Sequence, residues 1–140
     1  MVYDLRVMAP DQQLRITSPG QPLGDEVEEK LREGLDACPD LAFAHLVDVE
    51  VLDQGEGPGM VLFVWLVPAA MRSMRAALNL VSETVAKALP EDRFLDVVIL
   101  NSAPELLLEI ERTRSLLVAP HSDERQRALA AVSDDVLGSE

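Results

Sequence analysis

The sequence predicts an α+β protein built as one domain, and three observations support this. Some segments alternate between apolar and polar residues or are continuously apolar, as β-strands are. Between them lie segments whose apolar residues recur every three or four positions, as in helices. A chain of 140 residues is long enough to bury a core without disulfides or metals. Apolar residues make up 48% of the chain and aromatic residues only 4%, so we expect an aliphatic core.

The first two elements are a short strand and a helix. "LRIT" predicts a strand over residues 14–17, and the turn formers of "SPGQPLG" end it. "DEVEEKLREGLDAC" predicts a helix over 25–38, whose acidic first turn complements the positive end of the helix dipole. Pro39 ends this helix. Its apolar face consists of Val27, Leu31, Leu35 and Cys38, at spacings of four, four and three.

Two longer strands follow. "LAFAHLVDVEVL", residues 41–52, alternates toward its end and predicts a strand with one buried face. "MVLFVWLV", residues 60–67, is apolar at every position, so both of its faces must be covered. The buried face of the first strand carries Phe43, His45, Val47, Val49 and Val51.

The loop between these strands, "DQGEGPG", contains three of the chain's glycines and could be a phosphate cradle or a hairpin bend. A phosphate-binding glycine loop joins a strand to a helix, whose first N–H groups hold the anion. This loop joins two strands, lacks the lysine of a P-loop and carries Asp53 and Glu56. We therefore predict that Gly55 to Gly59 form a hairpin bend.

The second half of the chain continues the alternation. A helix is predicted over 69–89, a strand over 93–101, a helix over 102–114 and a short strand over 115–120. The helix over 102–114 opens with Ser102 and Glu105 in the register of a capping box. The buried stripe predicted for the long helix consists of Met71, Met74, Leu78, Val81 and Val85.

The order β-α-β-β-α-β predicts a ferredoxin-like sandwich with an additional C-terminal helix. In this plan residues 1–13 are an N-terminal extension, 14–120 the α+β domain, and 121–140 an acidic tail with partly helical character. Leu31, Leu78 and Val97 are predicted core positions.

The charge balance excludes several classes of partner. Twelve basic and 25 acidic residues give a net charge of −13, which repels nucleic acids and anionic membranes. The N-terminus does not resemble a signal peptide, and the longest apolar run, Met60 to Met71, is too short to span a bilayer. We expect a soluble cytoplasmic protein that binds neither nucleic acid nor membrane.

No group of residues predicts catalysis, a cofactor or a metal. His45 lies among apolar residues of a strand, where a buried, hydrogen-bonded role is favoured over a catalytic or ligand role. His121 is expected at the surface, and Cys38 is expected to pack as a small hydrophobe. Three acids, Asp48, Glu50 and Asp53, could gather a cation, but acids that alternate on a strand usually face solvent.

Three stretches together resemble the C-terminal domain of the enhanced serine sensitivity protein (SseB) family. They are "LAFAHLVDVEVLDQGEGPGMVLFVWLV", the long helix after it, and "FLDVVILNSAPELLLEIERTRSLLVAP". Ala44 to Leu46 matches the family's first strand, Asp96 to Leu100 matches a later one, and the likeness covers residues 14–120. The resemblance implies a bacterial accessory or interaction module and brings no catalytic residues.

A ferredoxin-like sheet leaves one face bare, and here that face is apolar. The helix over 102–114, the N-terminal segment, or the tail around Leu129 and Val132 could cover it, as could a second copy in a two-fold dimer. We favour a homodimer, because the tails are short and charged. The candidate interface for a dimer or a protein partner consists of Phe63, Trp65, Val67, Val98 and Leu100.

Three function classes remain open. The first is a non-catalytic interaction or regulatory module. The second is a small acidic protein similar to secretion chaperones, which holds an extended segment of its partner. The third is a dimeric sensor that binds a small molecule in a polar pocket near His45. We favour them in this order.

Overall fold

The structure, a computed structural model, describes residues 14–20, 23–51, 59–93 and 95–138. Every predicted strand is present, and the elements follow one another in the predicted order. The strands are β1 (Leu14–Thr17), β2 (Leu41–Val51), β3 (Gly59–Leu66), β4 (Asp96–Ile99) and β5 (Leu116–Val118). The α-helices are α1 (Asp25–Asp36), α2 (Met74–Ala88), α3 (Leu107–Arg112) and α4 (Ser122–Gly138). Short 3-10 segments are η1 (Pro68–Ser73), η2 (Leu100–Ser102) and η3 (Pro104–Leu106).

The five strands form one mixed sheet in the order β1-β2-β3-β4. β2 and β3 pair antiparallel, as expected of a hairpin, and the loop between them (52–58) lies outside the described residues. β3 and β4 are parallel and are joined through α2. β1 pairs with the second half of β2, from Asp48 to Val51, and β5 pairs with Ala44 and His45. Together these two short strands therefore line the outer edge of β2.

The ferredoxin-like strand order is not confirmed. That plan requires the first two strands to be parallel with another strand between them. Here β1 is an antiparallel neighbour of β2, and β4 lies beside β3. The sequence pattern predicts strands and helices from local periodicity, but it does not determine which strands become neighbours. The coarser prediction, a mixed α and β protein, is confirmed.

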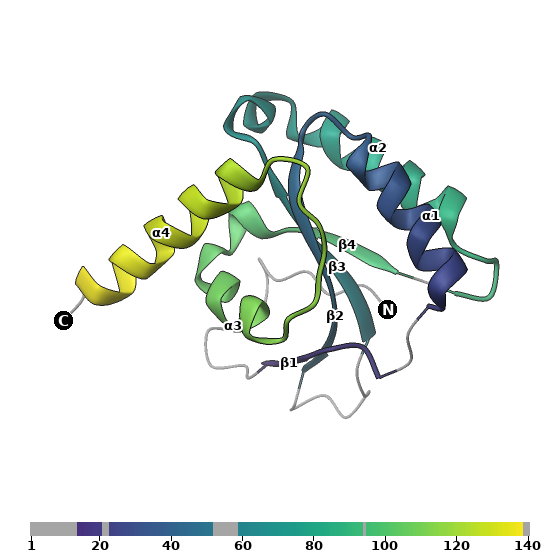
Figure 1. Ribbon diagram of the computed structural model, residues 1–140, viewed down its shortest axis with the longest axis horizontal. Coiled ribbons are helices and arrows are strands. Elements are labelled where there is room, and N and C mark those ends of the chain that lie inside the picture. The colour runs from purple at the N-terminus through teal and green to yellow at the C-terminus, as the bar shows by residue number, and fades with distance from the viewer. Residues whose placement is uncertain (1–13, 21–22, 52–58, 94, 139–140) are drawn as a thin grey trace.

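Helices cover both faces of the sheet, which gives three layers (Figure 1). α1 and α2 pack on one face, and α3 and α4 pack on the other. Between the sheet and α1 and α2 are buried Leu31, Leu35, Leu46, Leu62, Leu66, Val81 and Val85. On the opposite face are buried Phe43, Val47, Phe63, Leu100, Leu107, Ile110, Ala128 and Val132. The chain's own α3 and α4 thus cover the face that the ferredoxin-like plan leaves bare.

The predicted core positions are borne out in part. Leu31 is fully buried, as predicted, whereas Leu78 and Val97 are only half-buried. Both lie where α2 meets β4, and no further strand among the described residues pairs with the outer side of β4. The prediction for Met71 was wrong: its side chain is 38% exposed, because η1 precedes the α-helix and changes the periodicity.

The predicted start of the helix over 102–114 also needs correction. The α-helix begins only at Leu107, and Ser102 is an exposed residue of η2. No side-chain hydrogen bond caps η3 or α3, so the capping box does not form. The reason is local: Ala103 precedes Pro104 and has φ −139° and ψ 60°, because a proline disfavours the helical conformation of the residue before it.

Asn101 continues the pairing of β3 with β4 after β4 has ended. Its side-chain Oδ1 accepts a hydrogen bond from the backbone N of Leu66 at 2.8 Å. Its Nδ2 donates to the carbonyl oxygen of Leu66 at 3.1 Å. One side-chain amide therefore pairs with both backbone groups of Leu66, as a neighbouring strand would.

α1 and α2 approach each other closely at Gly34. A Cβ atom at this position would lie 2.5 Å from Cγ2 of Thr84, which is a clash. Thr84 donates to the carbonyl oxygen of Leu80 at 2.8 Å within α2. Cys38 is buried beside this contact, with its Sγ 3.5 Å from the carbonyl oxygen of Gly34. Its predicted role as a small packed hydrophobe is confirmed.

Candidate functional site

The most concentrated group of polar side chains in the described residues lies under α3 and α4, around His45. Alternation along β2 points His45 to the same face as Phe43 and Val47. The His45 side chain is 1% exposed, and the Phe43 ring meets it edge-on, with ring centroids 5.8 Å apart. The sequence predicted a buried, hydrogen-bonded histidine, and this is confirmed.

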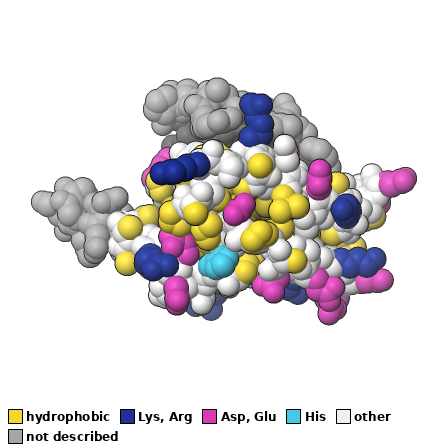
Figure 2. All heavy atoms as spheres, turned by 90° about the horizontal axis from the view of Figure 1, so that it is seen from above, with side chains coloured by type: hydrophobic (Ala, Val, Ile, Leu, Met, Phe, Trp, Pro, Cys, Tyr) yellow, Lys and Arg dark blue, Asp and Glu magenta, His cyan; other side chains and the backbone are white. Residues whose placement is uncertain are grey.

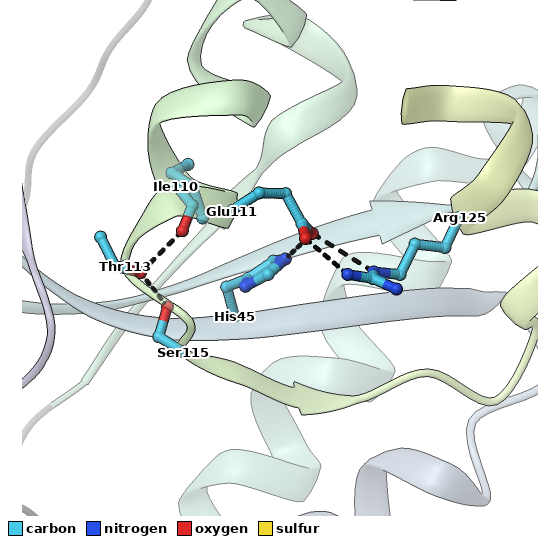
Figure 3. Close-up of polar contacts among 6 residues, drawn as sticks. All are labelled: His45, Ile110, Glu111, Thr113, Ser115 and Arg125. Atoms are coloured by element: carbon cyan, nitrogen blue, oxygen red, sulfur yellow. Dashed lines mark hydrogen bonds and ion pairs between the residues drawn. The ribbon is translucent and has the colours of Figure 1, made fainter. Parts of the chain in front are cut away.

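Glu111 joins His45 to both covering helices (Figure 3). Nε2 of His45 lies 2.6 Å from Oε2 of Glu111, at the end of α3. Arg125, in the first turns of α4, donates from Nη2 to Oε1 at 2.5 Å and from Nε to Oε2 at 3.3 Å. A two-pronged arginine–carboxylate pair of this kind fixes the geometry of both groups. One carboxylate therefore connects β2, α3 and α4.

The environment favours the neutral form of the His45 ring. Burial lowers the pKa of His45 below its ordinary value of 6.5, the attraction of Glu111 opposes this shift, and Arg125 adds to it. The neutral ring donates its Nε2–H to Glu111, whose negative charge is balanced by Arg125. Nδ1 is then a lone pair, and it has no hydrogen-bond partner in the part of the chain that the structure describes.

A carboxylate that orients a histidine is the arrangement that enzymes use to activate a nucleophile. The nearby hydroxyls do not complete such a site. Thr113 donates to the carbonyl oxygen of Ile110 at 2.6 Å, and its Oγ1 is hydrogen-bonded to Ser115 (Figure 3). The His45 ring is also sealed from solvent. His45, Glu111 and Arg125 therefore link β2, α3 and α4.

Other candidate residues also have structural partners. His121 is exposed, as predicted, and its Nε2 lies 3.2 Å from the carbonyl oxygen of Pro39. Asp48 accepts a hydrogen bond from the backbone N of Gly20 at 2.9 Å, and Glu50 pairs with Arg15 at 3.6 Å. Asp53 lies outside the described residues. Among those described, no three His, Cys, Asp or Glu side chains are placed to hold a metal ion.

The candidate interface residues divide into two groups. Phe63 and Leu100 are fully buried beneath α3 and α4. The other three are half-buried at the rim of that core: Trp65, Val67 and Val98. Trp65 stacks on Phe43, with ring centroids 5.7 Å apart and planes 9° from parallel. A partner that binds here would meet the rim residues, while Phe63 and Leu100 serve the chain's own core.

The structure adds a groove that sequence reasoning missed. A hollow of about 480 Å³ lies between α2 and β4. Its lining is mostly apolar: Leu78, Val85, Ala86, Leu89, Pro90, Leu95 and Val97, with Ser82, Glu91, Arg93 and Asp96. A periodic helix stripe predicts burial, so Leu78 gave no signal of a surface site. Leu78 is half-buried because it lies beside β4, the last described strand on that side of the sheet.

The surface carries no large region of one charge on the face seen in Figure 2. Apolar side chains gather in the middle of that face, and basic and acidic side chains are scattered around them. Among the described helices, none is long and apolar enough to cross a bilayer.

Comparison of the chain with protein families, with curated proteins and with solved structures gives no match in any of the three.

Proposed function

We propose that this chain is a non-catalytic protein-interaction module that acts in the bacterial cytoplasm. The observation that supports this most is the groove between α2 and β4, whose lining is mostly apolar. Catalytic pockets combine an apolar wall with convergent polar groups of altered pKa. Here the hydrogen-bonded group of His45, Glu111 and Arg125 lies elsewhere, under α3 and α4.

The resemblance to the SseB C-terminal domain agrees with such a role, because it implies an accessory module without catalytic residues. The alternative of a small-molecule sensor requires a polar pocket beside His45. The burial of that ring and its bond to Glu111 argue against this alternative. A chaperone-like protein that holds an extended segment is favoured next, because the groove borders an edge strand.

A capture experiment with two matched variants tests the interaction function. The immobilised protein is exposed to an extract of its native host, and the retained proteins are identified by mass spectrometry. Leu89→Glu places a charge in the groove. Leu80→Glu is the control, because Leu80 of α2 is 41% exposed and does not line the groove. We expect a protein that wild type and Leu80→Glu retain and Leu89→Glu loses.

Thermal unfolding of the three proteins shows whether each variant is folded. If folded Leu89→Glu retains the same proteins as wild type, the groove is not the interaction site and the proposal fails.

A further inference from the structure

β4 is the outermost strand on one side of the sheet. It pairs with β3 through residues 96–99, and no other strand among the described residues lies beside it. An edge strand presents backbone N–H and C=O groups that can pair with another chain. Val97, Val98 and Ile99 are each half-buried, so their side chains also remain partly accessible. β4 can therefore offer both backbone and side-chain contacts.

The groove described above lies directly beside this edge. Leu78 and Val85 of α2, with Leu89 directly after it, contribute one wall, and Leu95 and Val97 contribute the other. In a strand added to β4, alternate side chains point to opposite faces of the sheet. One set of side chains would thus enter the apolar groove, and the other set would lie on the face of Val98.

The charged side chains beside the groove are more acidic than basic. Glu91 and Asp96 line it together with one basic residue, Arg93. The whole chain carries a net charge of −13, so the surrounding field is negative as well. This balance favours a partner with positive charges beside its apolar residues.

We propose that β4 accepts an added strand from a protein partner, namely an extended segment with alternating apolar side chains flanked by Lys or Arg. This proposal rests on the interaction function proposed above and names its surface and the chemistry of the partner. Backbone pairing along the edge supplies affinity, and the groove selects the apolar side chains.

A second copy of the chain is a poorer occupant of this edge. Each copy carries a net charge of −13, and Glu91 lines the groove in both, so pairing two copies along this edge brings like charges together. The acids that favour a basic segment disfavour self-pairing.

The opposite side of the sheet is also less suitable. Its outer strands are β1 and β5, and neither contributes to the groove. Leu116 of β5 is 37% exposed and supplies a matched control position on that side.

A designed peptide tests the proposal without knowledge of the natural partner. The probe is fluorescein-labelled Lys-Lys-Val-Thr-Val-Thr-Val-Lys-Lys, and its control carries Glu in place of every Lys. Fluorescence anisotropy at low salt is expected to show binding of the basic-ended peptide at least about tenfold tighter than that of the acid-ended one. Added salt should reduce this difference. Val98→Lys should weaken binding by about tenfold or more, whereas Leu116→Lys should leave it within about twofold.

Hydrogen exchange on the wild-type protein gives a readout that does not depend on how the variants fold. The basic-ended peptide should slow exchange at the backbone amides of β4 and leave those of β1 and β5 unchanged. Protection at β1 or β5 instead of β4, equal binding of the two peptides, or no binding would each overturn the proposed strand addition. The interaction function would still stand if Leu89→Glu loses a partner in the capture experiment, so the two failures are distinguishable.

Discussion

His45 shows how one residue's environment is set by partners that are distant in the sequence. Alternation along "LAFAHLVDVEV" was enough to predict its buried face and its hydrogen-bonded state. The identity of its partner could not be predicted, because Glu111 lies 66 residues away and Arg125 lies on yet another element. Local periodicity carries no information about which charged residues meet on one face of the sheet.

The lowered pKa of His45 predicts a specific dependence of stability on pH. In the unfolded chain the ring binds a proton near its ordinary pKa of 6.5, and in the folded protein it binds one only at lower pH. The unfolded state therefore holds more protons between these two pKa values, and the free energy of unfolding falls as the pH falls below about 6.5. Above that pH the ring is neutral in both states and contributes no slope.

Urea unfolding at pH 8.0, 7.0, 6.0 and 5.5 checks this prediction. We expect a weaker pH dependence in His45→Gln, which keeps an N–H donor for Glu111 but does not titrate. His121→Gln, which replaces an exposed histidine, is the matched control variant. Identical profiles for wild type and His45→Gln would contradict the assignment.

At the scale of elements, sequence patterns located all five strands and missed details that depend on neighbours. The long helix was expected to begin at residue 69, yet Pro68–Ser73 is a 3-10 segment. The helix over 102–114 shortened to α3 because Ala103 cannot stay helical before Pro104. The side chain of Asn101 forms the backbone hydrogen bonds of Leu66 that a neighbouring strand would form, and the absence of a side chain at Gly34 leaves space for Thr84. Neither role has a local signature.

The close approach of Gly34 and Thr84 predicts that substitutions at these two positions have non-additive effects on stability. Gly34→Ala forces the new Cβ against Cγ2 of Thr84, so we expect a loss of about 1–3 kcal/mol in the free energy of unfolding. Thr84→Ala removes that methyl group and should offset most of the loss in the double variant. Denaturant unfolding of wild type, the two single variants and the double variant gives a double-mutant cycle. If the two effects simply add, the side chains do not clash.

The two hydrogen bonds of the Asn101 side chain predict a loss of stability when its amide group is removed. In Asn101→Leu the backbone N and O of Leu66 lose their partners in a part-buried position. We expect the free energy of unfolding to fall by about 1–3 kcal/mol. Ser102→Ala is the matched neighbour, because Ser102 is exposed and should matter by less than about 0.5 kcal/mol. Equal losses in both variants would refute the strand-like role of Asn101.

For the whole molecule, the central correction concerns what covers the apolar face of the sheet. The sequence showed that β3 needs cover on both faces, and this is confirmed by the two cores. It favoured a second copy over the chain's own segments as the source of that cover. α3 and α4 supply it, because Leu107, Ile110 and Val132 place apolar stripes against Phe43 and Phe63. Homodimer formation stays a prediction, and only the rim of this face remains available for it.

A chain that ends after Pro120 tests the importance of α4. Without this helix, Arg125 and the apolar contacts of Ala128 and Val132 are lost. We expect the shortened protein to be less stable and to associate as its concentration rises, because the uncovered apolar area favours self-contact. Light scattering over a range of concentrations compares its mass with that of the full chain. If the shortened and full-length proteins have equal masses at every concentration and equal stability, α4 is not needed to cover the sheet.

The position of Glu111 in the chain has a consequence for synthesis on the ribosome. β2 and β3 leave the ribosome well before α3 and α4, and chains grow at roughly 5–20 residues per second. Phe43, His45 and Phe63 are therefore exposed to water for several seconds until Glu111 and Arg125 arrive. During that interval these apolar side chains are available for contacts with other molecules, and slower translation of residues 100–130 would lengthen it.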